Sequence, residues 1–363
     1  MFPFFSFFFM MFEFMNTYPF FDSSLHLTRR HFFGKSALGV GTAAMARLLH
    51  IDLNGSSSGF ANGLHHKAKA KRVIYLFMSG GPSHLDLWDY KPKLSEEFGK
   101  DLPANVRDGQ RITGMTSKQK NLPVCPSKYK FTHQDNNADG VWISELLPHT
   151  STVAKDLCVV HTAFTEAINH DPAITYIQSG SQIPGRPSLG AWLSYGLGSL
   201  NKDLPDFVVV PSAFWSGRVN VQALYARLWG SGFLPSRHQG TSFQNVGDPV
   251  LFLSNPRGID PDVRRRMLDT LGKINAKHQE EIGDPEIQTT IAQQEMAFRM
   301  QASVPGLMDT SDETQATMDL YGTKGADGTF AANCLLARRL AERGCRFIQL
   351  YHCLLYTSDA ADE

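Results

Sequence analysis

The stretch Val73-Ile74-Tyr75-Leu76-Phe77-Met78-Ser79-Gly80-Gly81-Pro82 decides the fold class of this chain. It is a continuous apolar run closed by glycine and proline, which is typical of a strand buried on both faces. Such strands lie in the middle of parallel sheets, where helices cover both sides. We therefore predict that residues 73–78 form a central strand of a parallel sheet.

Downstream of this run, strand and helix patterns alternate along the chain. Further short apolar runs predict strands at residues 157–161, 207–211 and 347–350. Apolar residues at helical spacing predict helices at residues 145–156, 172–179, 189–197, 263–277, 287–300 and 330–343. Gly344 is well placed to end the last of these helices. The alternation predicts an α/β sandwich with a mostly parallel sheet.

Composition excludes several classes of protein. The 363 residues include 35 Lys and Arg and 35 Asp and Glu, so the formal net charge is zero. No bulk field therefore favours nucleic acid or an acidic membrane, and we expect no nucleic-acid partner. The 5 cysteines show no C-x-x-C spacing, which excludes a zinc knuckle or a redox pair.

An arginine pair near the N-terminus predicts export. Arg29 and Arg30 are followed by aromatic residues and then by the weakly apolar segment Ala37–Leu49, and this pattern resembles the twin-arginine signal of bacteria. The segment is shorter than the about 20 apolar residues that span a bilayer, so we expect no stable transmembrane span. We expect a periplasmic or exported protein that meets the twin-arginine export machinery. The alternative is an ordinary amphipathic helix with two adjacent cations.

Composition shifts divide the chain into segments. We interpret residues 1–14 as sequence read ahead of a true start at Met15, with a genuine apolar anchor as the alternative. Residues 15–53 form the signal region, residues 54–71 a linker, and residues 72–352 the folded domain. Residues 353–363 resemble a translated sequencing adapter, and the alternative is a genuine short acidic terminus.

The loop after the first predicted strand carries two side chains with metal-binding chemistry. His84 and Asp86 lie just past the carboxyl end of residues 73–78, the edge at which ligands bind in open α/β sheets. An imidazole and a carboxylate at this spacing suit a metal site or acid–base work. The alternative is a turn in which Ser83 and Asp86 cap local backbone groups.

A second motif, Asn169-His170-Asp171-Pro172-Ala173, predicts the start of a helix, with Asp171 as N-cap and Pro172 as first helical residue. His170 would then stand where exposed N–H groups and the helix dipole favour an anion. That position suits a nucleophile or acid for phosphate or sulfate esters, with Asn169 beside it as an anion-binding candidate. The alternative is a histidine packed in a loop.

A third candidate is Arg186, between Gly185 and Pro187. A guanidinium group can hold an anion through two parallel hydrogen bonds. The alternative is an arginine that braces its own loop.

Several stretches together resemble one known family. They are Gly80–Asp89, Ser144–Pro148, Gly185–Trp192, Tyr195–Gly198, Ala297–Gln301 and Cys334–Leu340. On these stretches the chain resembles the exported bacterial family catalogued as domain of unknown function 1501, of the alkaline-phosphatase-like and sulfatase superfamily. The resemblance runs from the signal region to His352.

The resemblance implies an alkaline-phosphatase-like α/β sandwich, incomplete at its C-terminus. Sulfatases carry their nucleophile in a Cys-x-Pro-Ser-Arg motif that opens a helix, and here His170-Asp171-Pro172 takes that place, which implies His170 as the catalytic residue. The resemblance also implies a divalent metal held by Asp86, with His84 beside it. A Trp-Asp-x-His segment and later ligands should follow Tyr351, but residues from Cys353 onward replace them. We therefore expect a fragment that holds half of a site and is itself inactive.

Two functions follow from these expectations. The first is an exported, metal-assisted hydrolase of sulfate or phosphate esters, acting on an anionic ester or polysaccharide. The second is a non-catalytic exported binding module on a degenerate hydrolase fold. His170 in place of the usual Cys, Ser or Thr favours the second, and the pair of His84 and Asp86 favours the first.

Overall fold

The computed structural model describes residues 69–79, 81–107, 116, 118–135, 140–212, 225–250 and 253–353. The interpretations of residues 1–14 and 15–53, that of residues 353–363 apart from Cys353, and that of most of the linker lie outside these residues. Ala70–Lys277 and the described residues from Glu286 onward belong to one compact unit, which contains the sheet.

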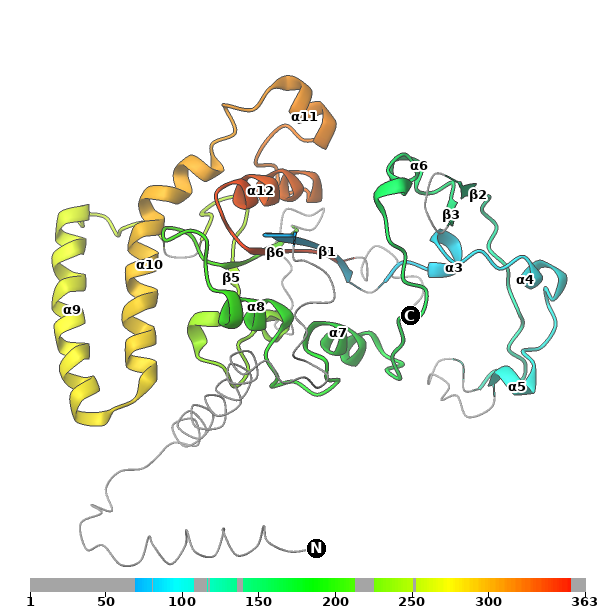
Figure 1. Cartoon of the computed structure of the whole chain (residues 1–363), viewed down its shortest axis with the longest axis horizontal. Helices are drawn as coiled ribbons and strands as arrows, with labels where there is room; N and C mark the ends of the chain where they lie inside the picture. The colour runs from blue at the N-terminus through cyan, green and yellow to red at the C-terminus, as the bar shows by residue number, and fades with distance from the viewer. Residues whose placement is uncertain are drawn as a thin grey trace, which may run out of the picture. The chain divides into compact units, whose positions relative to one another are not determined.

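Four parallel strands form the central sheet, in the order β1 (Val73–Ser79), β6 (Phe347–Cys353), β4 (Phe207–Pro211) and β5 (Thr241–Ser242) (Figure 1). Leu350 at the centre of β6 pairs with Leu76 on one side and Val210 on the other. Because all four strands run the same way, their carboxyl ends meet at one edge. The predicted mixed α/β class with a mostly parallel central sheet is confirmed.

The position of β1 differs from the prediction, because β1 is an edge strand. Ile74, Leu76 and Met78 are 42%, 52% and 47% exposed, whereas Tyr75 and Phe77 point to the other face and pack against the core there. The apolar run is therefore well covered on one face only, because the core that α12 shares with β4 and β6 does not include Ile74, Leu76 or Met78. No described strand pairs with the outer side of β1, which makes it an edge strand. A run of apolar residues does not distinguish a central strand from such an edge.

Helices cover the two faces of the sheet. On one face, α7 (His170–Ser179) and α8 (Leu189–Leu197) pack Ile174 and Leu193 against a core that includes Phe207. On the other face, α10 (Pro285–Met308) and α12 (Phe330–Glu342) share a core with β4 and β6. Figure 1 shows α12 on one side of the sheet and α7 with α8 on the other.

Local chemistry explains the ends of α12. The hydroxyl of Thr329 caps the helix by accepting a hydrogen bond from the Ala332 N–H. Gly344 follows the helix with φ of 90°, a backbone conformation that favours glycine. The predicted helix at residues 330–343 is therefore confirmed, together with those within α7, α8 and α10.

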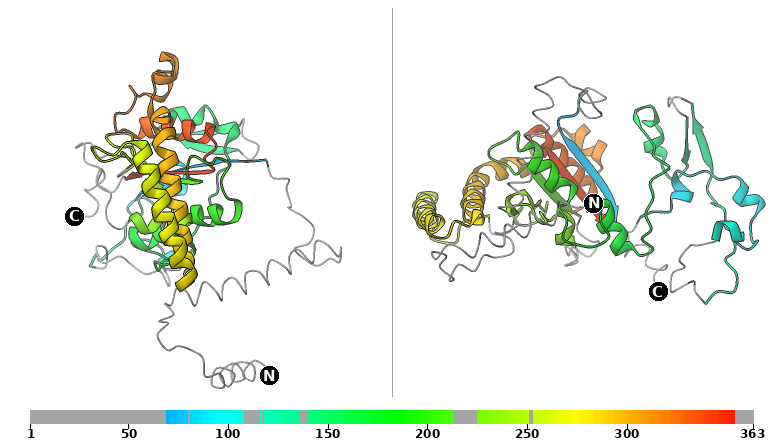
Figure 2. Two further views of the ribbon diagram at one scale, coloured as in Figure 1. Left: turned by 90° about the vertical axis from the view of Figure 1, so that its left-hand side faces the viewer. Right: turned by 60° about the horizontal axis from the view of Figure 1, so that its bottom comes forward.

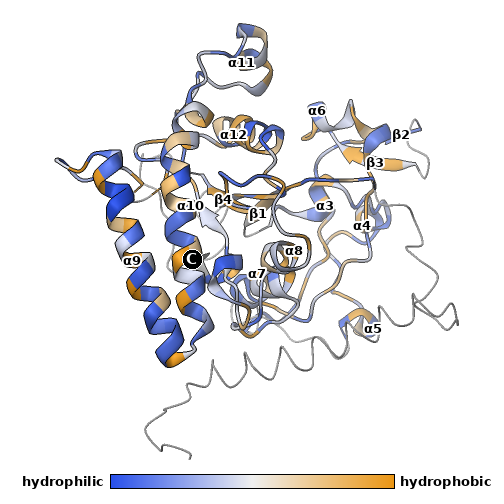
Figure 3. Ribbon diagram, turned by 60° about the vertical axis from the view of Figure 1, so that its left-hand side comes forward, coloured by the Kyte–Doolittle hydropathy of each residue, from blue (hydrophilic) through white to orange (hydrophobic). Residues whose placement is uncertain are grey.

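The long helix α9 (Pro261–Ile282) runs beside α10, as Figures 1 and 2 show, and contains the predicted helix at residues 263–277. Arg265 of α9 binds Glu295 of α10 through two hydrogen bonds of 2.9 and 2.5 Å. Figure 3 shows hydrophilic and hydrophobic bands alternating along both helices, as expected for helices with one packed side.

Two predictions for the region before α7 are wrong. Residues 157–161 form no strand, and Val160 is 67% exposed, whereas Val159 packs against a small core around Ile143. The predicted helix at residues 145–156 is broken into α6 (Pro148–Ser151) and the 3₁₀ helix η1 (Ala154–Asp156). The apolar side chains here serve that small core instead of the central sheet.

That small core belongs to an antiparallel hairpin of β2 (Phe131–Gln134) and β3 (Val141–Ser144). The other described elements are α3 (His84–Leu87), α4 (Lys93–Glu96), α5 (Ala104–Arg107), η2 (Tyr225–Trp229), η3 (Ser236–His238) and α11 (Gln315–Tyr321). None of the helices within the described ranges is both long enough and apolar enough to cross a bilayer.

Candidate functional site

A cavity of about 470 Å³ opens beside the carboxyl end of β1. Phe77, Met78 and Gly81 form one wall, and α7 forms another. The segment before α7 closes the cavity with Phe164. The cavity therefore lies at the edge of the sheet where ligands bind in open α/β folds.

His170 is the first residue of α7 and lines this cavity. Asn169 occupies the N-cap position with extended backbone, but its side chain makes no capping hydrogen bond. The helix therefore begins two residues earlier than predicted, with Asn169 instead of Asp171 as the N-cap and His170 instead of Pro172 as the first helical residue. The Asp171 carboxylate is instead paired with the guanidinium of Arg227, which fixes the first turn of α7 to η2.

Buried polar side chains connect α7 to the centre of the sheet. Gln349 of β6 donates a hydrogen bond of 2.6 Å to Gln178 of α7, and the same amide nitrogen lies 2.9 Å from the Tyr351 hydroxyl. Gln178 and Gln349 are only 2% and 1% exposed. Burial raises the pKa of the neighbouring Tyr75 hydroxyl, so this phenol stays neutral. Because buried amides need partners, this contact fixes α7, and with it His170, against β6.

His84 and Asp86 lie on α3, and neither lines the cavity that holds His170. The His84 side chain is 71% exposed, with its Nε2 3.8 Å from an Asp89 carboxylate oxygen. Asp86 accepts a hydrogen bond of 2.7 Å from the Ser127 hydroxyl. Within the described residues, no group of three His, Cys, Asp or Glu side chains that could hold a metal ion is present.

Arg186 lies on an exposed loop, outside the lining of the cavity. The backbone of this loop packs so closely on Gly232 that a Cβ there would come within 2.4 Å of Pro187 N. Arg186 is therefore on a tightly held loop. Of the five site residues predicted from the sequence, the cavity is lined by His170 alone.

The sequence did not indicate a group of hydrogen-bonded polar side chains that lies at the amino end of β4, away from the cavity that holds His170. His238 Nδ1 lies 2.8 Å from Ser194 Oγ, and Ser194 donates to the Asp206 carboxylate over 2.7 Å. Arg237 Nε donates to His238 Nε2 over 3.0 Å, so the imidazole proton is on Nδ1. Burial, and then the Arg237 charge, lower the pKa of His238 and keep it neutral.

Since His238 donates to Ser194 in this arrangement, it does not act as a base for that hydroxyl. Ser194, Asp206 and His238 come from separate parts of the chain, so no local motif could have indicated the cluster.

The fold and site define a mixed α/β protein with a parallel sheet and a histidine at a helix N-terminus beside the sheet's carboxyl edge. Residues 70–354 match the model of the family described as "Protein of unknown function (DUF1501)", and the chain belongs to that family. No curated protein and no solved structure matches it.

Proposed function

We propose that this protein is an exported hydrolase of sulfate or phosphate esters that binds its substrate in the cavity at the carboxyl edge of the sheet. The observation that carries this proposal is the position of His170, which lies in the first turn of α7 and lines that cavity. The assignment to the alkaline-phosphatase-like and sulfatase superfamily is part of the same proposal.

The helix end supplies the binding chemistry. The first N–H groups of a helix have no partner within the helix, and the dipole adds partial positive charge, so an anionic ester group is favoured there. In this proposal a protonated His170 donates a hydrogen bond to the ester and passes its proton to the leaving oxygen as water attacks phosphorus or sulfur, and the proton that the water then releases returns to the imidazole. The products are an alcohol and inorganic phosphate or sulfate.

A divalent metal is a further proposal, with His84 and Asp86 as donors. Because these two side chains do not meet a third donor among the described residues, we assign no reaction step to a metal.

A second candidate function is a binding module without catalysis. The observation that favours it is the apolar character of the cavity, whose walls include Phe77, Met78, Phe164, Ile174 and Ile177. Among the described residues that line it, His170 is the one acidic, basic or cysteine side chain, and Tyr176 adds a phenol. Such walls suit the apolar part of an ester and supply few groups for proton transfer.

The test uses 4-nitrophenyl phosphate and 4-nitrophenyl sulfate with the full chain. Binding is measured by calorimetry, and hydrolysis by nitrophenolate release. The variants are His170→Ala and, as a matched control, His161→Ala, an exposed histidine of the segment before α7 that does not line the cavity. Loss of a general acid typically costs about 10²–10⁴ in rate.

Hydrolysis that falls by this factor in His170→Ala and persists in His161→Ala would support the hydrolase. Binding without hydrolysis, lost only in His170→Ala, would support an anion site at His170 in a chain without catalysis, as expected both of a binding module and of an inactive fragment of the hydrolase. Esters that bind and react equally in all three proteins would exclude His170 from both functions.

A further inference from the structure

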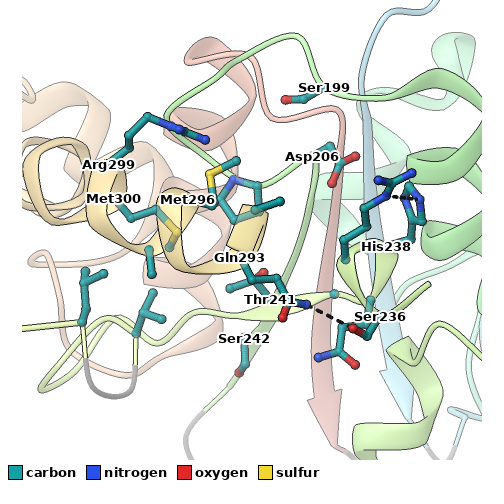
Figure 4. Close-up of a pocket in the computed structure, with 18 of the residues that line it drawn as sticks. Ser199, Asp206, Ser236, His238, Thr241, Ser242, Gln293, Met296, Arg299 and Met300 are labelled. Carbon is teal, nitrogen blue, oxygen red and sulfur yellow. Dashed lines mark hydrogen bonds between the residues drawn. The ribbon is translucent and has the colours of Figure 1, made fainter. Parts of the chain in front are cut away.

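A second and larger cavity, of about 790 Å³, lies between β5 and α10 (Figure 4). One side is formed by Thr241, Ser242 and Gln244, and the other by residues of α10. It has no residue in common with the cavity that holds His170. Its volume lies within the range of about 300–1,000 Å³ typical of ligand sites.

On the strand side of this cavity, one residue of β5, Ser242, has backbone groups that pair with no described strand. Val209 pairs with Ser242, and the Phe243 N–H donates to the Val209 carbonyl over 2.8 Å. In a parallel ladder, Thr241 and Phe243 therefore turn their backbone groups toward β4, whereas Ser242 turns its N–H and C=O away. β5 is the last strand on this side of the described sheet. Ser242 thus offers one donor and one acceptor to an added strand.

The helix side offers apolar and adaptable surface. Met296 and Met300 project from α10 toward the cavity, and Ala292 and Ala297 of the same helix also line it. Figure 4 shows Gln293 reaching from α10 toward Ser236, whose hydroxyl accepts from the Gln293 amide over 3.4 Å. Thioether side chains fit varied apolar groups because they are flexible and polarisable.

The charge of the lining is positive. Arg299 donates through Nε to the Lys202 carbonyl over 2.8 Å and lies 3.9 Å from an Asp203 carboxylate oxygen, at the exposed rim. Arg237 donates through Nε to His238. The terminal nitrogens of both guanidinium groups make no hydrogen bond within the described part of the chain. Among the described lining residues, Asp206 is the one carboxylate against these two arginines, and it already accepts from Ser194. The cavity therefore favours an anionic partner.

We propose that this cavity binds an extended acidic peptide segment, which adds a strand to β5. A peptide group supplies both the acceptor and the donor that the Ser242 backbone requires. The side chains on alternate residues then face α10, where Met296 and Met300 receive apolar groups. Carboxylates along the segment meet Arg299 and Arg237.

The probe is a short fluorescent peptide of alternating Glu and Val residues, with binding followed by fluorescence polarisation on the full chain. Two comparison peptides are used on the unmodified protein. One has the same sequence with N-methylated backbone, which removes the strand donors. The other has Lys in place of Glu, which reverses the charge. We expect both to bind about tenfold more weakly. The N-methylated peptide loses several backbone hydrogen bonds, and the Lys peptide loses its charge-assisted hydrogen bonds and meets like charges.

Variants of the chain test the same contacts. Ser242→Pro removes the outward N–H, a substitution that edge strands tolerate, and Ser242→Ala is its control because it retains the N–H. Arg299→Gln removes one cation, and Lys273→Gln on exposed α9 surface is the matched control. We expect weaker binding of the Glu and Val peptide to Ser242→Pro and Arg299→Gln, and unchanged binding to the two controls.

Equal binding of the N-methylated peptide would overturn strand addition even if Ser242→Pro failed to fold. Equal binding of the Lys peptide would overturn the charge argument. Self-association of the chain that Ser242→Pro abolishes without any peptide binding would also overturn the proposal. Selective binding of the unmodified acidic peptide would support it.

Discussion

Gln349 at the centre of β6 and Gln178 near the end of α7 share a hydrogen bond of 2.6 Å although both side chains are almost completely buried. This contact crosses from the sheet to the helix that begins with His170. A polar pair in an otherwise apolar interface fixes one arrangement of the helix, because a shifted helix would leave the Gln178 carbonyl oxygen without this partner, while Gln349 would keep only the Tyr351 hydroxyl of its own strand. The pair thus links the core of the fold to the geometry of the candidate site.

Replacing one member of this pair should cost more than replacing both. Gln349→Leu leaves the Gln178 amide buried without its partner, and we expect a loss of about 1–3 kcal/mol in the free energy of unfolding. The double variant with Gln178→Leu should recover part of that loss. Urea unfolding of the single and double variants measures the coupling, and additive losses would show that the two amides do not depend on each other.

Arg339 should be among the most sensitive positions in the chain. Its side chain is 3% exposed, donates over 2.9 Å to the Leu307 carbonyl near the end of α10, and lies 2.7 Å from Asp312 and 2.5 Å from Glu313. Arg339→Met removes the partner of the Leu307 carbonyl and of Asp312 and leaves Glu313 with Arg338 alone, with an expected cost of about 3–5 kcal/mol. Lys273→Met on exposed α9 surface should stay within about 0.5 kcal/mol of the parent. Equal thermal stability of both variants would contradict this role.

From the same ion pairs we predict that the stability of the folded chain depends on pH. Hydrogen bonds from Arg339 lower the pKa values of Asp312 and Glu313 in the folded chain. Groups with a lowered folded pKa stabilise the protein above their unfolded pKa of about 4 and lose that effect as the pH falls through the folded value. The stability difference between the parent chain and Arg339→Met should therefore shrink below about pH 4. A difference that is constant with pH would refute the assignment.

The lowered pKa of His238 leads us to predict a second effect of pH on stability, at a higher pH than that of the carboxylates. Since burial lowers its folded pKa, the unfolded chain binds the proton more readily, and stability falls as the pH drops below the unfolded value of about 6.5. In His238→Gln this part of the loss should disappear. Chemical unfolding of both proteins between neutral and mildly acidic pH makes the comparison. Parallel pH profiles would show that His238 does not titrate with unfolding.

The sequence allowed prediction of those elements whose apolar pattern and end signals agree. α8 and α12 lie where helical spacing placed them, and β4 where a short apolar run placed it. β1 was found but placed wrongly in the sheet, because an apolar run does not reveal how many neighbours a strand has. β5, with only 2 residues, carries no pattern that could reveal it.

The candidate site was predictable only in part. His170 was found through the residues that start its helix, which is a local signal. Residues 157–161, which precede this helix, form no strand, yet His170 still lies beside the end of β1. Contacts such as that of Ser194 with His238 depend on tertiary packing between distant segments, so no spacing in the sequence indicates them.

Export is testable apart from the fold. Changing Arg29 and Arg30 together to Lys in a fusion of residues 15–53 to a reporter should abolish delivery to the periplasm, because the arginine pair defines the signal. Cell fractionation measures the reporter in each compartment. The unmodified fusion serves as the positive control, and equal periplasmic delivery of both fusions would refute the export proposal.

The anion site at the start of α7 is tested most directly by nitrogen-15 NMR of the histidine rings of the full chain while phenyl phosphate is added. The account predicts a saturable shift of the His170 ring signals, assigned from their loss in His170→Ala, while the His161 and His84 signals stay in place. An ester that binds without moving the His170 signals, or that moves the exposed histidines equally, would contradict an anion site at the start of α7.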